Sequence, residues 1–229
     1  THPVSCTVGG FSKVPDKESM RELREIIYLA LPDLHETVTL FAKLKWPVFR
    51  RPTESIALMK MDEYPFYDGE IASSVGRTYV VSDYMKVANE RVVAHSTAKH
   101  AKHIADSYRV GALARYTLNS RWLNLEAKSA AAQLHLSENL DNSYYNSVAQ
   151  IVECVHAAYD SVHLIDTLLE RDLHHETIKV VPRSGKGAAA VEVPRGILFH
   201  EYEYDEHGII TQANCIIPTG QNLANIEND

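Results

Sequence analysis

The apolar positions of the chain recur mostly with the period of an α-helix. The first such stretch follows Asp16, a residue type that caps helices, and its apolar residues return every three, four or seven positions: Met20, Leu23, Ile27, Leu34, Val38 and Phe41. This spacing predicts one buried helical face. Pro32 lies inside the stretch, and because proline removes a donor and clashes with the preceding turn, we expect it to kink or interrupt the helix near Leu31.

Three further stretches also favour helix. They run from about residue 83 to 108, from about residue 113 to 134, and onward from Asn142. The last is the clearest, because its apolar residues form a wide stripe: Val148, Ile151, Val152, Val155, Tyr159, Val162, Ile165 and Leu169. Long amphipathic helices of this kind pack as a bundle. Between residues 47 and 81 the pattern is irregular, and only residues 55–59 and 78–81 are typical of short strands.

The pattern changes near Ile178. Residues 184–187 are glycine-rich and predict a flexible loop, whereas residues 197–204 and 209–217 are β-rich runs on either side of an Asp-Glu-His-Gly turn, which is a hairpin signal. We therefore expect an α+β, predominantly helical fold. A bundle of long helices would occupy residues 1–177, and a loop with a C-terminal β-hairpin would occupy residues 178–229.

Composition and charge exclude several classes of partner. The chain has 229 residues and a net charge of −7, so we expect neither nucleic acid nor an anionic membrane as a partner. No apolar run is long enough to span a bilayer, and we expect a cytoplasmic location. Cys6, Cys154 and Cys215 form no Cys-x-x-Cys pair, which rules out an iron–sulfur or structural zinc site built from this chain's thiolates alone.

One histidine group invites a metal-site interpretation. His100 and His103 would share one face of a helix that also holds His95, as a metal pair requires. However, no carboxylate or thiolate accompanies them in that stretch, and Lys99 and Lys102 would repel a cation. The favoured interpretation is a solvated, basic helix face.

Other candidate groups also favour ordinary roles. The Gly-Lys-Gly run at residues 185–187 lacks the Ser or Thr that a phosphate-binding loop needs after its lysine, so a mobile loop is favoured. Cys6 near His2 has no third group to orient it and is interpreted as a loop cysteine. Four acids near the hairpin turn fit solvated positions better than acid–base catalysis: Glu201, Glu203, Asp205 and Glu206.

A motif near the C-terminus carries more information. Pro194-Arg195-Gly196 is a turn signal that leads into the hairpin, and the far end of the hairpin returns Pro218-Thr219 and then Asn222. Such a hairpin would bring Arg195 and Thr219 close together. The fixed donors of arginine and the hydroxyl of threonine together suit a small anionic ligand. On the residues alone, an arginine held in a structural salt bridge is the favoured alternative.

This segment, with the following His200, resembles the fourth signature region of [NiFe]-hydrogenase large subunits. Two other stretches agree with that family. His2-Pro3 followed by Gly9-Gly10 and Lys13 is similar to its His-Pro…Gly-Gly element, and residues 110–115 resemble its Val-Gly-Pro-Leu-Ala-Arg element, with Ala112 where proline is common. Because the matches lie at the start, middle and end, the resemblance covers essentially the whole chain.

The resemblance implies H2 activation at a nickel–iron centre whose iron carries cyanide and carbon monoxide. In the family, two Cys-x-x-Cys motifs hold the metals; Thr1 would lie downstream of the first and Asp229 upstream of the second, so this chain has no nickel ligands and we expect the fragment itself to be inactive. Arg195 would overhang the metals and donate to a cyanide, Thr219 would donate to the second cyanide, and Pro194 would line the same pocket with its carbonyl and backbone facing these ligands. The backbone carbonyl of Cys215 would face a magnesium or iron ion.

The resemblance also implies partners. Residues 202, 204, 214 and 221–222 look most like the cytosolic enzymes that couple hydrogen to NAD(P), deazaflavin or a soluble carrier. We expect two protein partners, a small iron–sulfur subunit plus an electron-carrier-linked subunit, and we expect self-association of the fragment through exposed apolar surface. One alternative is the related quinone-site subunit of respiratory complex I, which usually has lysine at the position of Arg195 and lacks the Pro-Thr…Asn pattern. Another is a helical interaction module that binds no metal.

Overall fold

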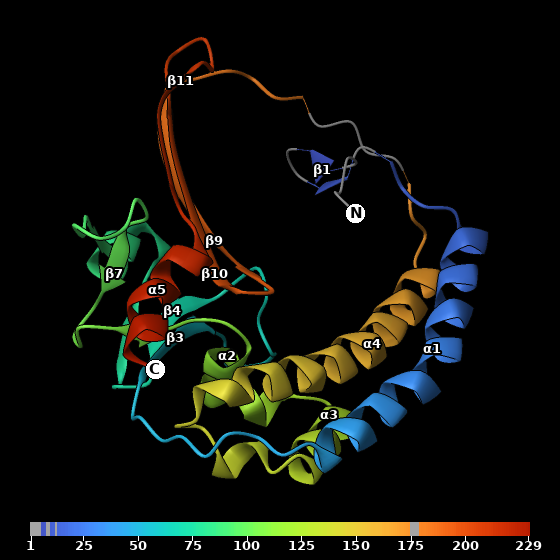
Figure 1. The fold of residues 1–229 in the computed structure, drawn as a ribbon. Coiled ribbons are helices and arrows are strands. Elements are labelled where there is room, and N and C mark those ends of the chain that lie inside the picture. Colours follow the sequence, from blue (N-terminus) through green and yellow to red (C-terminus); the bar gives the residue numbers. More distant parts are fainter. Residues whose placement is uncertain (1–5, 8–9, 12, 175–178) are drawn as a thin grey trace.

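The computed structural model describes residues 6–7, 10–11, 13–174 and 179–229, and its two longest helices lie side by side (Figure 1). Helix α1 (Lys17–Lys43) begins at Asp16, whose side chain accepts a hydrogen bond from the backbone N–H of Ser19 at 2.8 Å, and α4 (Asn146–Glu170) packs along it. We expected Pro32 to kink or interrupt the helix; the helix runs unbroken through it, so the interruption does not occur. Packing against α4 offsets the loss of one backbone donor.

The single helix predicted over residues 113–134 is wrong, because the chain forms two helices there. Helix α2 (Ala112–Asn119) is followed by a 3₁₀ turn, η2 (Ser120–Trp122), and by α3 (Leu125–Gln133). Two asparagines make the break. The Asn119 amide donates to the carbonyl of Leu58 at 2.8 Å, and the Asn124 side chain caps α3 by accepting from the N–H of Ala127 at 2.9 Å. Helix α4 follows two further 3₁₀ turns, η3 (Leu136–Glu138) and η4 (Ser143–Tyr145).

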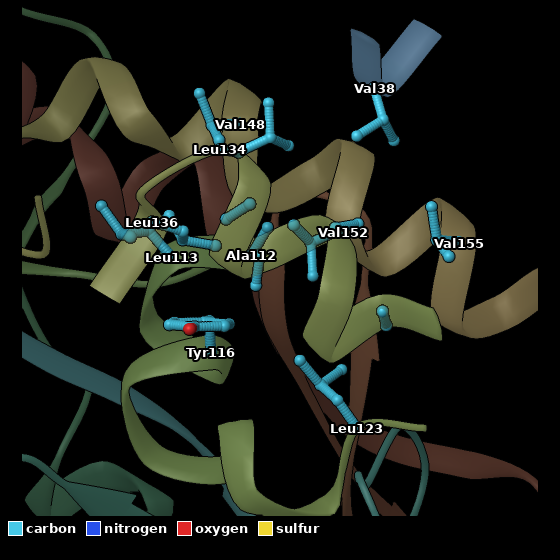
Figure 2. Close-up of a cluster of buried hydrophobic side chains, with 14 of the residues drawn as sticks. Val38, Ala112, Leu113, Tyr116, Leu123, Leu134, Leu136, Val148, Val152 and Val155 are labelled. Atoms are coloured by element: carbon cyan, nitrogen blue, oxygen red, sulfur yellow. The ribbon is translucent and has the colours of Figure 1, made fainter. Parts of the chain in front are cut away.

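A first hydrophobic core lies where α2, α3 and α4 meet one side of α1 (Figure 2). Its fully buried members include Leu113, Leu136, Val148, Val152 and Val155. The stripe that the sequence indicated over α4 is therefore the surface on which the other helices pack.

A four-stranded sheet, which the sequence indicated only in part, lies next to these helices. Its strands follow the order β5 (Arg77–Tyr79), β4 (Glu70–Ser73), β3 (Glu54–Met59) and β8 (Tyr108–Arg109), with β8 parallel to β3 and the other pairs antiparallel. Strand β3 confirms the prediction at residues 55–59, and β5 overlaps the one at residues 78–81.

The helix predicted over residues 83–108 is wrong beyond its first turn. The chain makes a 3₁₀ helix, η1 (Val81–Lys86), and then an antiparallel pair, β6 (Asn89–Arg91) and β7 (His100–Lys102). The apolar residues do not share one face, because Val87 is buried whereas the side chain of Val92 is 83% exposed. Packing of β7 against the C-terminal helix decides the local structure.

The C-terminal hairpin is confirmed and is one strand wider than predicted. Strands β9 (Gly185–Val193), β10 (Gly196–Tyr204) and β11 (Ile210–Ile216) form an antiparallel sheet in the order β11-β10-β9. The flexible loop expected at residues 184–187 is wrong, since Gly185 and Lys186 pair with Tyr204 and Glu203 of β10. Lys186 also forms an ion pair with Glu201 at 3.0 Å, which the sequence pattern did not reveal.

Three elements near the ends of the chain complete the fold. Helix α5 (Pro218–Asn228) follows β11 and was not predicted. Near the N-terminus, β1 (Cys6–Thr7) pairs antiparallel with β2 (Gly10–Phe11).

A second hydrophobic core joins the sheets. It combines Ile56 and Leu58 of β3 with Ile197 and Phe199 of β10, and the Phe199 ring stacks on that of Tyr84. The α+β class is confirmed, but predominance of helix is not, because sheets build this core. The division of the chain at residue 177 stays a prediction, and the second core contains residues from both sides of it. Among the described residues, no helix is long and apolar enough to cross a bilayer.

Candidate functional site

The Pro-Arg-Gly turn joins β9 to β10 and packs directly on the chain just before α2. Gly196 has φ +136°, and a Cβ added to it would lie 2.3 Å from Cγ2 of Val110. Gly111 has φ +111°, and a Cβ there would lie 3.1 Å from the carbonyl oxygen of Arg195. Both glycines are therefore required by the positive φ and by the close approach of the two backbones.

Asn222 of α5 connects these two segments. Its Oδ1 accepts from the N–H of Val110 at 2.8 Å, and its Nδ2 donates to the carbonyls of Val110 and Arg195, each at 3.3 Å. The neighbouring Gln221 is buried and donates to the carbonyl of Ile197 at 2.7 Å. The three motif stretches that the sequence singled out in the middle and at the end of the chain thus meet at one place.

Arg115 belongs to a buried ion-pair network and also bonds the backbone at the start of the turn. Its guanidinium bonds both carboxylate oxygens of Glu153, each at 2.6 Å, and Oε2 of Glu192 at 2.8 Å. It also donates to the carbonyl of Val193 at 2.9 Å and to that of Pro194 at 3.3 Å. All five donors of the arginine are used. Burial raises the pKa of the Glu192 carboxyl to about 7, and the Arg115 guanidinium opposes that rise.

Arg195 and Thr219 are exposed at this junction, whereas Pro194 is tied through its carbonyl to Arg115. Among the residues that the structure describes, none offers the Arg195 guanidinium a hydrogen bond or an ion pair, so the structural salt bridge that sequence reasoning favoured is absent there. Thr219 lies in the first turn of α5, directly after Pro218. The two side chains are accordingly available to a ligand.

A small cavity of about 160 Å³ opens beside Val110 and Asn222. Arg109 and Ser143 line it, and in the described part of the chain Nη1 of Arg109 and Oγ of Ser143 are buried without a hydrogen-bond partner. Burial lowers the pKa of Arg109 to about 10. The guanidinium still carries its charge at neutral pH, and the carboxylate of Asp229 lines the same cavity.

The cysteines do not form a metal site in the described residues. Cys154 lies in α4, and burial raises the pKa of its thiol. Cys215 lies in β11, opposite His200, and its Sγ is 3.2 Å from His200 Nδ1. The candidate pair Cys6 and His2 cannot be compared with the structure, because His2 and the Cys6 side chain lie outside the described residues, as do Pro3 and Gly9.

The histidines expected on a solvated helix face are arranged differently. His103 Nδ1 lies 2.5 Å from Oε1 of Glu54, and its Nε2 lies 2.9 Å from the hydroxyl of Tyr79. His100 is only 3% exposed, and both it and His95 contact Glu227. The prediction was wrong because the partner carboxylates are far away in sequence. A similar separation in sequence hid the partners of Arg115, although this arginine is the last residue of a recognised motif.

The chain resembles hydrogenase subunits over almost its whole length. It is 31% identical to the alpha subunit of sulfhydrogenase 1 of Pyrococcus furiosus over 99% of this chain and 53% of that protein. It is 27% identical to one subunit of the F420-non-reducing hydrogenase vhu of Methanococcus voltae over 99% of this chain and 58% of that protein. The chain thus spans about half the length of these relatives. No family model matches it.

The fold agrees with these similarities. A solved NAD+-reducing [NiFe]-hydrogenase superposes with a TM-score of 0.60 at 22% identity, over 98% of this chain and 54% of that one. Sequence and fold point the same way. The chain is therefore similar in sequence to hydrogenase subunits over about half of their length, and it shares the fold of a solved [NiFe]-hydrogenase chain.

Proposed function

We propose that the chain is part of the catalytic subunit of a cytoplasmic [NiFe] hydrogenase, which oxidises H2 or reduces protons in exchange with a soluble electron carrier. The observation that carries the proposal is the junction made by Asn222. It joins the Val110-Gly111 segment, the Pro-Arg-Gly turn and α5, and leaves the side chains of Arg195 and Thr219 exposed, with no hydrogen bond to them from the described residues.

Arg195 and Thr219 would act as hydrogen-bond donors to the anionic ligands of the metal centre. Diatomic ligands that carry negative charge need donors when they are shielded from water, and outer hydrogen bonds tune the electronics of a metal. Thr219 is also in the first turn of an 11-residue helix, where the helix dipole favours negative charge. Pro194 would line the same pocket, with its carbonyl fixed by Arg115.

The residues of this chain suit the outer wall of such a centre and not its inner ligands. The sequence has no Cys-x-x-Cys pair, and its described thiols, Cys154 and Cys215, lie on different elements. A nickel–iron centre would supply the H2 chemistry, and its thiolates would come from other parts of the protein. The backbone carbonyl of Cys215 facing a magnesium or iron ion is part of the same proposal.

Partners follow by analogy with the relatives. One solved structure with this fold is named as NAD+-reducing, and one relative as F420-non-reducing. We propose two partners in the complete enzyme: a small iron–sulfur subunit and an electron-carrier-linked subunit.

The test uses the complete enzyme that contains this chain. Nickel is measured per enzyme, and H2-dependent reduction of a viologen dye is followed under anaerobic conditions. Stoichiometric nickel together with dye reduction is expected. An enzyme without nickel and without H2-dependent reduction would contradict the proposal.

A further inference from the structure

We propose that His95, His100 and Glu227 form a binding site for a divalent transition-metal ion of the zinc class, separate from the junction at Arg195. The three residues come from different parts of the fold. His100 lies in β7, His95 in the connection between β6 and β7, and Glu227 in the last turn of α5. A bound ion would fasten α5 to the β6–β7 pair.

The ligand atoms are already close enough to share an ion. Nε2 of His95 lies 2.9 Å and 3.1 Å from the two oxygens of Glu227, and Nε2 of His100 lies 3.2 Å from Oε1 of the same carboxylate. All three ligand atoms lie within 4.8 Å of one another. Zinc bonds imidazole nitrogen and carboxylate oxygen at about 2.0–2.2 Å, so neighbouring ligand atoms on a tetrahedral ion lie roughly 3.4 Å apart. Small side-chain adjustments would reach that spacing.

The burial of His100 and its unpartnered ring nitrogen are an independent indication of a ligand. The residue is 3% exposed, and its buried Nε2 has no hydrogen-bond partner in the described residues. Glu227 is near, but the direction from this nitrogen to Oε1 is not that of a hydrogen bond. A buried polar atom left without a partner is costly. A metal ion between the imidazole and the carboxylate would satisfy it.

Charge and access also suit a cation. Lys99, the nearest lysine in sequence, is neutralised by an ion pair with Glu90 at 2.9 Å. Glu227 stands at the C-terminal end of α5, where the helix dipole favours positive charge. The side chains of His95 and Glu227 are 62% and 46% exposed, which gives an ion an entry path and leaves room for water as a fourth ligand.

Two imidazoles and one carboxylate define the class of ion. Imidazole prefers zinc and its first-row neighbours, whereas magnesium and calcium prefer oxygen ligands throughout. The site should therefore take Zn²⁺ and discriminate against Mg²⁺.

The test is a titration of the full chain with Zn²⁺ by isothermal calorimetry, after treatment with a chelator and with its thiols alkylated. Wild type should bind one ion. His95→Ala and Glu227→Gln should each weaken binding by about tenfold or more, because loss of an outer-shell partner alone costs about 10–100-fold. The matched control is His207→Ala, which removes another exposed histidine beside an acid, Glu206, and should bind as wild type does.

A second readout separates metal binding from a merely hydrogen-bonded cluster. Zn²⁺ should raise the melting temperature of wild type and of His207→Ala, and should raise those of His95→Ala and Glu227→Gln by clearly less at the same zinc concentration; Mg²⁺ should raise none. Absence of zinc binding to wild type, or equal binding by His95→Ala, Glu227→Gln and wild type, would overturn the proposal.

Discussion

The side-chain amide of Asn222 donates a hydrogen bond to the backbone carbonyl of Arg195 at 3.3 Å, across 27 positions of sequence. The same amide is bonded to both backbone groups of Val110. Helix α5 and the Pro-Arg-Gly turn consequently cannot move independently. Since Thr219 lies in α5 only three positions before Asn222, this side chain helps to set the arrangement of the two proposed donors, together with the bond from Gln221 to the carbonyl of Ile197.

We predict that Asn222→Ala lowers the free energy of unfolding by about 1–3 kcal/mol, because it leaves the N–H of Val110 and two carbonyls without their partner. Urea unfolding of the full chain measures this. Asn228→Ala, the same substitution on the same helix, removes one hydrogen bond at an exposed position and should cost less. Equal losses in the two variants would contradict the role given to Asn222.

Gly196→Ala should destabilise the chain strongly. A residue other than glycine at φ +136° costs about 1–3 kcal/mol by itself, and the new Cβ would also overlap the side chain of Val110. Two controls separate these effects in thermal unfolding. Gly76→Ala has φ +83° with open space around it, and Gly187→Ala has neither problem. The expected order of melting temperatures, from highest to lowest, is Gly187→Ala, then Gly76→Ala, then Gly196→Ala; any other order would refute the packing argument.

Sequence periodicity predicted α1, α4 and the β10–β11 hairpin. Helix α4 buries a regular stripe, so local pattern and tertiary structure agree there, whereas α1 buries only Met20 and Val38, and β11 is mostly exposed. Strand β9 and the β6–β7 pair were missed because backbone pairing and contacts with distant elements stabilise them.

The sequence predicted which residues belong to the motif, but it did not predict the hydrogen bonds and ion pairs that position them. Arg195, Thr219 and Asn222 were visible as residues of one segment, but the contacts that hold them involve Val110 and Arg115, which lie far away in sequence. No pattern in a single sequence reveals that Glu153 and Glu192 neutralise the same arginine.

Arg115→Met should cost roughly 3–5 kcal/mol of unfolding free energy, because it leaves two carboxylates buried without their cation. Adding Glu192→Gln should recover part of that loss, since the amide needs no counter-charge. Urea unfolding of Arg115→Met, Glu192→Gln and the double variant forms a double-mutant cycle that measures the coupling between the two residues. Lys186→Met, which breaks the exposed pair with Glu201, should have little effect. Strictly additive losses for Arg115→Met and Glu192→Gln would rule out this coupling.

The free energy of unfolding should fall as the pH drops below 6.5, because protonation of His156 favours the unfolded chain. Burial holds the pKa of this imidazole below its ordinary value of 6.5, and Nδ1 accepts a hydrogen bond from the N–H of Asn124 at 3.2 Å. Below pH 6.5 the unfolded chain takes up a proton that the folded chain resists, so acid favours unfolding. His156→Gln cannot titrate and should show a shallower fall in a pH series of urea unfolding. Identical slopes for wild type and variant would exclude His156 as the source.

The role of Arg195 at the metal centre is tested most directly by the turnover of Arg195→Lys in the complete enzyme, with nickel determined on the same sample. A lysine keeps the charge and loses the fixed fork of donors. We predict turnover lower by about 10²-fold, as loss of one preorganised donor can cause, with nickel content unchanged. Arg183→Lys, at an exposed position before β9, should behave as wild type. Wild-type turnover in Arg195→Lys would contradict the claim that this arginine acts on the metal centre.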